Sequence, residues 1–143
     1  MIDSEVERLL KRAIDLHGHL GPFLVIGVKM GLIGKRYFGF EGGSKSGLQV
    51  VVRTHLFPPF SCVIDGIQAA TSCTVGNRRL TVEESAREVS AYFRCPHSDK
   101  MLKVSVRREA LDRLEKQLAN NVDIEDLARA ALGISDNELF EAE

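Results

Sequence analysis

The sequence is poor in several features whose absence narrows its function. It has no tryptophan, three cysteines without regular spacing, and no apolar run near the roughly 20 residues that a membrane-spanning helix needs. The net charge of −1, with no basic stretch interleaved with aromatic residues, argues against a nucleic-acid partner. The odd number of cysteines argues against a disulfide framework and favours a reducing, cytoplasmic setting. The first residues show no basic segment followed by an apolar one, so we also expect no signal peptide.

Length and composition indicate one globular domain over residues 1–143, with 44% hydrophobic and 27% charged residues. Apolar residues recur with a helical period in some segments and alternate in others. Helices are predicted over residues 3–15, 22–38, 62–72, 108–120 and 123–132, strands over 48–53, 80–84, 88–94 and 101–107, and a short last helix over 135–140. The order α-α-β-α-β-β-β-α-α predicts an α+β fold in which helices pack on a small, mostly antiparallel sheet.

Two of these segments carry more detailed expectations. The helix over 22–38 is apolar on most sides, so we expect it to be central and buried. Its three glycines, Gly27, Gly31 and Gly34, lower helix propensity and favour close packing against a neighbouring element. The β-branched run in the strand over 48–53 favours burial on both faces.

The most distinctive stretch is LHGHLGPF over residues 16–23. His17 and His19 lie two residues apart around Gly18, which permits a sharp bend. Pro22 suits the first turn of a helix, so both imidazoles are predicted in a turn between two helices. Neutral imidazole is the commonest metal donor near pH 7, and this spacing favours a metal site or a catalytic pair. The alternative is that both histidines only cap or pack.

A second stretch, SCVIDGIQ over residues 61–68, combines a thiol, a carboxylate and an amide. Cys62 opens a predicted helix, where the helix terminus lowers the pKa of a thiol and favours a ligand or a nucleophile. Asp65 and Gln68 are three residues apart and share a helix face, so both are candidates to line a pocket or to hydrogen-bond a bound group. Cys62 is alternatively a buried structural cysteine, and Asp65 a first-turn cap.

The helix geometry limits how the thiols can act together. Cys62 and Cys73 lie eleven residues apart, which is about 16 Å along a continuous helix at about 1.5 Å per residue. Thiolate–zinc bonds are about 2.3 Å long, so at most one of these thiols joins His17 and His19 on one ion. We favour Cys62, because the preceding loop is long enough to reach the histidines. Cys73 would line a second wall or simply be packed.

Two further candidates are weaker. Cys95 and His97 form a Cys-x-His pair, but no partner pair stands nearby, and we interpret the segment as a hairpin turn between two strands. His55 precedes a Pro-Pro loop and is a minor ligand candidate.

Two stretches together resemble the family named for the E subunit of formylmethanofuran dehydrogenase. They are HGHLGP at 17–22, running into GVKMG at 27–31, and CVIDGIQAATSCTVGN at 62–77. The resemblance extends from about residue 8 to the C-terminal region. It implies an α+β domain and a metal, zinc above all, held by His17, His19 and Cys62. The residues that match the pocket side of the second motif, and are therefore candidates for cofactor binding, are Asp65, Gln68, Cys73 and Thr74.

The sequence also departs from the family pattern. Members usually carry a cysteine where Gly21 stands, and many carry a C-terminal zinc ribbon with paired Cys-x-x-Cys knuckles that this sequence does not show. The family name records association with a molybdenum or tungsten enzyme that fixes carbon dioxide onto methanofuran.

The resemblance implies a zinc pocket with an open position for a small-molecule ligand. Such a domain would serve one-carbon or molybdopterin-linked redox metabolism, as accessory or enzyme, beside a larger oxidoreductase. The alternative is a non-catalytic module for assembly or dimerisation, and we expect a homodimer. A third hypothesis makes Cys62 a nucleophile with a histidine as its base.

Overall fold

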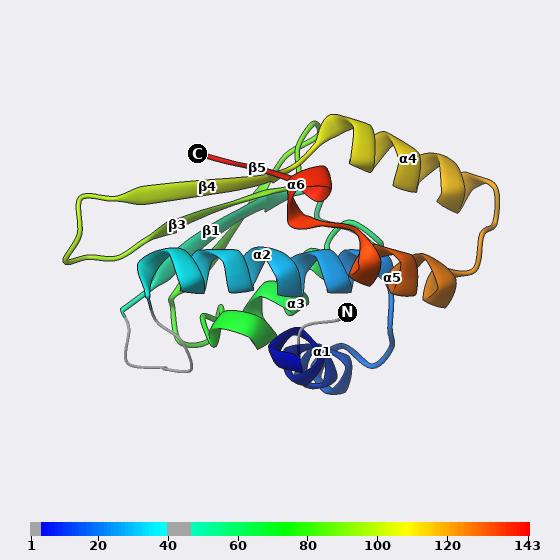
Figure 1. Cartoon of the computed structure of the whole chain (residues 1–143). Coiled ribbons are helices and arrows are strands. Elements are labelled where there is room, and N and C mark those ends of the chain that lie inside the picture. Colours follow the sequence, from blue (N-terminus) through cyan, green and yellow to red (C-terminus); the bar gives the residue numbers. More distant parts are fainter. Residues whose placement is uncertain (1–3, 40–46) are drawn as a thin grey trace.

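A computed structural model describes residues 4–39 and 47–143 and confirms the predicted α+β fold and element order (Figure 1). Within these residues the helices are α1 (Ser4–His17), α2 (Pro22–Phe38), α3 (Cys62–Thr71), α4 (Arg108–Ala119), α5 (Ile124–Gly133) and α6 (Asp136–Leu139). The strands are β1 (Gln49–Thr54), β2 (Leu80–Glu84), β3 (Ser90–Arg94), β4 (Met101–Val106) and β5 (Phe140–Ala142). The predicted bounds differ from these by two residues or fewer, but β5 was not predicted.

The strands form one sheet in the order β2-β1-β3-β4-β5. β1 and β2 run parallel, and the other neighbouring pairs are antiparallel, as the prediction of a mostly antiparallel sheet requires. Parallel neighbours need a long crossover that usually contains a helix, and here the crossover contains α3. α3 follows β1 after residues 55–61, so Cys62 is the first residue of the helix in this crossover.

Helices α1, α2 and α3 form layers beneath one face of the sheet. In Figure 1, α2 and α3 lie under the strands and α1 lies beneath these two helices. Phe23, Ile67 and Phe93 belong to the apolar core between sheet and helices, and Leu9 and Leu24 to a second apolar cluster among the helices. No helix in the described part of the chain has both the length and the apolar character that crossing a membrane requires.

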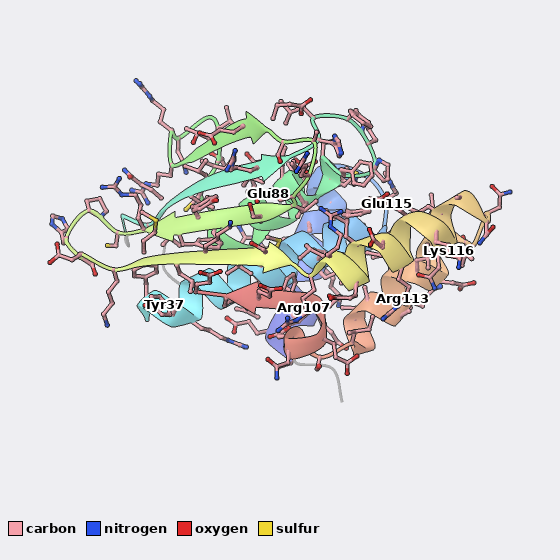
Figure 2. The ribbon with its side chains drawn as sticks, turned by 90° about the horizontal axis from the view of Figure 1, so that it is seen from above. Tyr37, Glu88, Arg107, Arg113, Glu115 and Lys116 are labelled. Atoms are coloured by element: carbon pink, nitrogen blue, oxygen red, sulfur yellow. The ribbon has the colours of Figure 1, made fainter. Side chains whose placement is uncertain are left out.

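The other face of the sheet is open. Figure 2 shows the strands in front of α2 and α3 when the molecule is seen from above. Val50 and Val52 of β1 are buried, whereas Val51 and Arg53 are partly exposed. The prediction that β1 is buried on both faces is therefore wrong, because its outer side chains meet solvent instead of a second layer.

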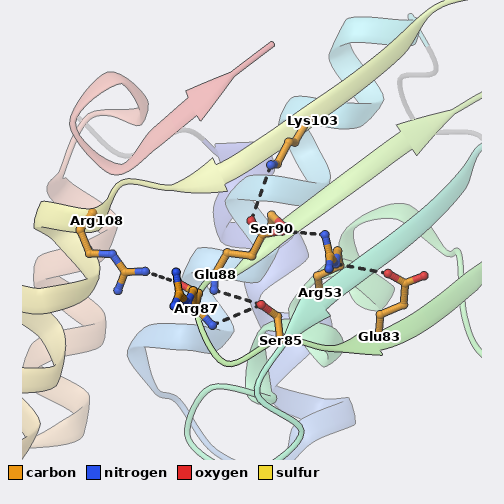
Figure 3. A network of polar contacts seen from close by, with 8 residues as sticks. All are labelled: Arg53, Glu83, Ser85, Arg87, Glu88, Ser90, Lys103 and Arg108. Carbon is orange, nitrogen blue, oxygen red and sulfur yellow. Dashed lines mark hydrogen bonds and ion pairs between the residues drawn. The ribbon is translucent and has the colours of Figure 1, made fainter.

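A polar network crosses this open face (Figure 3). Arg53 Nε lies 3.3 Å from a Glu83 oxygen, and Arg53 Nη1 lies 3.3 Å from a Glu88 oxygen. Lys103 Nζ lies 3.6 Å from Glu88, whose carboxylate also accepts a 2.8 Å hydrogen bond from the Ser90 hydroxyl. The network links β1 to β4, but exposed ion pairs contribute only about 0–1 kcal/mol each.

Glycines allow α2 and α3 to pack with their backbones in contact. A Cβ at Gly27 would overlap the backbone carbonyl oxygen of Val63, and a Cβ at Gly66 would overlap that of Leu24. Gly31 and Gly34 likewise leave room only for Ala70 and Phe93. The predicted close packing of the α2 glycines is confirmed, and it fixes α3 against α2 next to the histidine turn.

A buried lysine ties α5 to α2. Lys29 Nζ donates hydrogen bonds to the backbone oxygens of Ala131 (2.9 Å) and Ile134 (2.7 Å), at the C-terminal end of α5. Burial lowers the pKa of Lys29, and the carboxylate of Asp136 partly offsets that effect. These bonds hold α5 in place, and Ile124 at its first turn then reaches the start of α2.

Candidate metal centre

A cavity of about 630 Å³ lies at the end of the molecule where the α1–α2 turn approaches α4 and α5 (Figure 1). Its lining comes from the histidine turn, from residues 58–60, from the start of α3, and from α4 and α5. His17, His19 and Cys62 all line it. The structure therefore brings the three predicted metal ligands to one cavity.

The two histidines flank Gly18, the residue that follows the end of α1. The Gly18 N–H donates a 2.7 Å hydrogen bond to the Ile14 oxygen, and Gly18 adopts a φ of +102°, which favours glycine. His17 is thus the last residue of α1 instead of part of the turn, and His19 follows the bend. The bend brings the two rings together, with their centroids 4.6 Å apart and the ring planes 40° apart.

A chain of hydrogen bonds fixes the ring of His17 from behind. His17 Nδ1 lies 2.7 Å from Asp65 Oδ2, and Asp65 Oδ1 accepts a 3.2 Å hydrogen bond from Gln68 Nε2. Gln68 Oε1 in turn accepts a 3.0 Å hydrogen bond from the Val75 N–H. A carboxylate only accepts, so the proton of a neutral His17 ring belongs on Nδ1 and the lone pair on Nε2. Nε2 is buried and has no hydrogen-bond partner in the described part of the chain.

Cys62 is half-buried at the start of α3 and lines the cavity. Burial raises the pKa of its thiol, and the neighbouring Asp65 carboxylate raises it further. The expectation that the helix terminus lowers this pKa is therefore wrong, because desolvation outweighs it. A thiol with a raised pKa becomes a thiolate readily only when a positive charge lies close to it.

Cys73 and Thr74 lie away from this cavity. The Cys73 side chain is buried, and its Sγ donates a 3.1 Å hydrogen bond to the Leu48 backbone oxygen. Burial also raises the pKa of the Cys73 thiol. Thr74 belongs to the following turn, where its Oγ1 accepts a 3.0 Å hydrogen bond from the Asn77 N–H. Of the four predicted cofactor-binding residues, Asp65 and Gln68 thus support His17, and Cys73 and Thr74 organise the chain after α3.

The three weaker candidates for metal binding, Cys95, His97 and His55, lie in a hairpin turn and beside two phenylalanine rings. Cys95 is buried and His97 exposed in the turn between β3 and β4, as the hairpin interpretation predicts. The His55 ring lies 5.1 Å from the Phe57 ring and 4.9 Å from the Phe60 ring, centroid to centroid. His55 therefore supports the aromatic segment that forms one cavity wall.

The donor set at the cavity fits zinc in its chemistry. Two imidazoles and one thiol are ligands that zinc prefers, and a carboxylate behind a ligating histidine is the usual second partner of such a ring. As the side chains stand in the described residues, no three His, Cys, Asp or Glu groups converge closely enough to hold an ion. Binding would therefore require His17, His19 and Cys62 to close around the metal.

Sequence reasoning missed the opposite wall of the cavity. Phe60, Glu115, Leu118 and Ile124 line it, and three of them come from helices more than fifty residues beyond the histidines. The Pro-Pro loop before Cys62 was a usable signal for Phe60. No local pattern marks Glu115 or Ile124, because only the packing of α4 and α5 brings them here.

Comparison with known proteins agrees with this architecture. The family model described as "FmdE, Molybdenum formylmethanofuran dehydrogenase operon" matches residues 16–141. A curated protein of Archaeoglobus fulgidus, named "Probable S-adenosyl-L-methionine-binding protein", is 30% identical over 137 residues, a match covering 81% of this chain and 37% of that protein. This chain thus spans little more than a third of that relative. Because the family match covers most of the chain, including both cavity histidines and Cys62, the protein belongs to the FmdE family.

Proposed function

We propose that the protein binds zinc in this cavity through His17, His19 and Cys62. The observation that carries the proposal is the state of the His17 ring. Its Nδ1 is engaged by the Asp65 carboxylate, and its buried Nε2 has no partner among the described residues. Histidines that bind zinc commonly make this second contact, which fixes the ring and raises its basicity.

An open coordination position follows from the residue at 21. Gly21 lines the cavity where the family pattern usually has a cysteine, so three protein donors remain. Three protein ligands and one open position are typical of catalytic zinc. Bound zinc would act there as a Lewis acid toward a small molecule. The surrounding residues would support this chemistry: Asp65 orients the His17 ring, and Phe60 helps to exclude water from the cavity.

We further propose that the domain serves one-carbon or molybdopterin-linked redox metabolism, as accessory or enzyme. The FmdE family match supports this role, because the family description names a formylmethanofuran dehydrogenase operon. A larger oxidoreductase is the partner that an accessory role requires, and the cavity offers the small-molecule site that an enzymatic role requires.

The name of the Archaeoglobus relative makes S-adenosylmethionine a second ligand to test. A cavity of about 630 Å³ has the volume of an ordinary small-molecule site, for which about 300–1,000 Å³ is typical. Calorimetric titration that shows saturable binding, lost in His17→Ala, would support this ligand. If no binding is seen, the function in the relative's name would belong to the part of that protein that this chain does not match.

Zinc binding is tested by competition with a chromogenic chelator on protein stripped of metal. The wild type is expected to bind one equivalent, and His17→Ala to bind more than about 100-fold more weakly, since even losing a supporting contact costs about 10- to 100-fold. His97→Ala, an exposed histidine in a hairpin, is the matched control and should bind like the wild type.

The same assay has a gain-of-affinity variant. A Cβ at Gly21 would meet only the Ile124 Cγ2 atom, at 3.3 Å, and the Ile124 side chain is partly exposed and can shift. Gly21→Cys therefore adds a fourth donor without disturbing the backbone and should tighten zinc binding. Wild-type protein that binds no zinc, or equal affinities in wild type and His17→Ala, would refute the proposal.

A further inference from the structure

A carboxylate of α4 also lines the cavity. Glu115 lines it from α4, and its side chain is exposed. Across residues 4–39 and 47–143, no hydrogen bond or ion pair engages the Glu115 carboxylate. In Figure 2, Glu115 lies on one side of α4, and Arg113 and Lys116 lie on the other. Arg113 instead borders the groove between α4 and α5.

Aromatic and aliphatic side chains make up much of the remaining lining. Phe23 and Phe60 both line the cavity, and their rings meet edge to face with centroids 5.3 Å apart. Leu118 and Ile124 add aliphatic surface beside Glu115. An aromatic face attracts a cation within about 6 Å of its centre by about 0.5–1 kcal/mol when exposed.

The acidic and basic side chains of the lining are not balanced. Glu115 is its carboxylate, and neither lysine nor arginine lines the cavity in the described part of the chain. A site for phosphate or for a nucleotide would normally supply arginine, lysine or a helix N-terminus with free N–H groups. Helices α2, α3 and α5 do begin at the cavity, but Pro22 removes one N–H from α2. The first N–H groups of α3 already donate to the oxygens of residues 59–61, and the Asp123 side chain caps α5.

We propose that the cavity takes an organic cation: a small molecule with a flat or apolar body and an ammonium-type group that pairs with Glu115. The apolar body lies against Phe60, whose ring packs on the buried Phe23, and another part of the molecule reaches His17, His19 and Cys62. This inference deepens the proposed function, since it names the class of small molecule for the same site. It does not depend on zinc, because the aromatic wall and Glu115 are present without the metal.

The test compares three probes of similar size that differ in charge: 2-phenylethylammonium, 2-phenylethanol and 3-phenylpropanoate. Binding to the full chain is followed by ligand-observed NMR at pH 8 after chelator treatment. Glu115 is the carboxylate among the described lining residues, so a preference for the ammonium points to it. We expect the wild type to prefer the ammonium over the alcohol by about fivefold, the scale of an exposed charge pair, and over the carboxylate by more.

Two variants decide the source of the preference. Glu115→Gln should bind the ammonium and the alcohol equally, whereas Glu109→Gln, an exposed glutamate of α4 outside the cavity lining, should keep the wild-type preference. The inference is overturned by equal binding of all three probes to the wild type, by a preference for the carboxylate, by no binding of any probe, or by a preference that survives Glu115→Gln. Zinc affinity is measured in parallel and should be unchanged in Glu115→Gln, so the two proposals fail separately.

Discussion

Asp65 shows how one residue joins distant parts of this chain into a site. Its carboxylate accepts from His17 across 48 positions of sequence, and it is itself held by Gln68. Gln68 also accepts from the Val75 N–H, so the turn after α3 is coupled to the ring at the end of α1. Asp65 therefore positions His17 and raises the pKa of Cys62, whether or not it touches a ligand.

The raised pKa of Cys62 predicts slow alkylation at neutral pH in metal-free protein. Only the thiolate reacts, so the rate should climb as the pH passes a midpoint above the value of about 8.5 for a free cysteine. Iodoacetamide rates measured by mass spectrometry of the Cys62 peptide check this expectation. Added zinc should protect the thiol at each pH at which the protein binds the metal.

Asp65→Asn is the comparison for this experiment. Removing the carboxylate removes one cause of the raised pKa, so the midpoint should fall while burial still keeps it high. A wild-type midpoint below about 8.5 would contradict the raised pKa and would favour Cys62 as an activated nucleophile.

At the scale of elements, the site depends on the contact between α2 and α3. This contact fixes α3, the helix that bears Cys62 and Asp65, against the first half of α2. Gly27→Ala would force a methyl group into the Val63 carbonyl oxygen and push the helices apart. We expect the free energy of unfolding to fall by about 1–3 kcal/mol, the usual cost of overpacking. Urea denaturation followed by circular dichroism measures it.

Gly133→Ala is the matched control, since Gly133 ends α5 and a Cβ there meets no atom within 4 Å. This change should be neutral or stabilise by about 0.4–1 kcal/mol, because it restricts the unfolded chain. If Gly27→Ala were as stable as Gly133→Ala, the close α2–α3 contact would be wrong.

The element-scale predictions from sequence succeeded where the pattern is local. The apolar periodicities of α1, α4 and α5 and the glycines of α2 were sufficient, because each reports a buried face or a close approach directly. β5 was missed, since its three residues are too few for an alternating pattern and it exists through pairing of Phe140 with Val106. The burial of β1 was misjudged, because β-branched residues fit a half-exposed strand equally well.

At the scale of the whole molecule, the homodimer stays a prediction. Leu56, Phe57 and Ile124 are exposed apolar side chains toward the cavity end, and a second copy is expected to cover such surface. Light scattering should give twice the 15.8 kDa of one chain, and Phe57→Ser should lower that mass toward one chain. A wild-type monomer at micromolar concentration would contradict the expectation.

Part of the candidate site could be predicted from local sequence, and the rest depends on the fold of the whole chain. His17, His19 and Cys62 stand out as metal donors by residue type and spacing, and the fold places all three around one cavity. The arrangement of side chains in the site was visible only in the tertiary structure. Asp65 supports His17, Cys73 packs on Leu48, and α4 supplies part of the cavity wall. Residue types indicate what chemistry is available, and packing decides which groups meet.

The central claim is that two imidazoles and one thiol of this cavity share a zinc ion. Anomalous diffraction across the zinc absorption edge, on crystals grown with zinc, tests it most directly. We expect a peak about 2.0–2.3 Å from a ring nitrogen of His17, a ring nitrogen of His19 and Sγ of Cys62. No peak in the cavity, or a peak bound elsewhere such as beside His97, would contradict it.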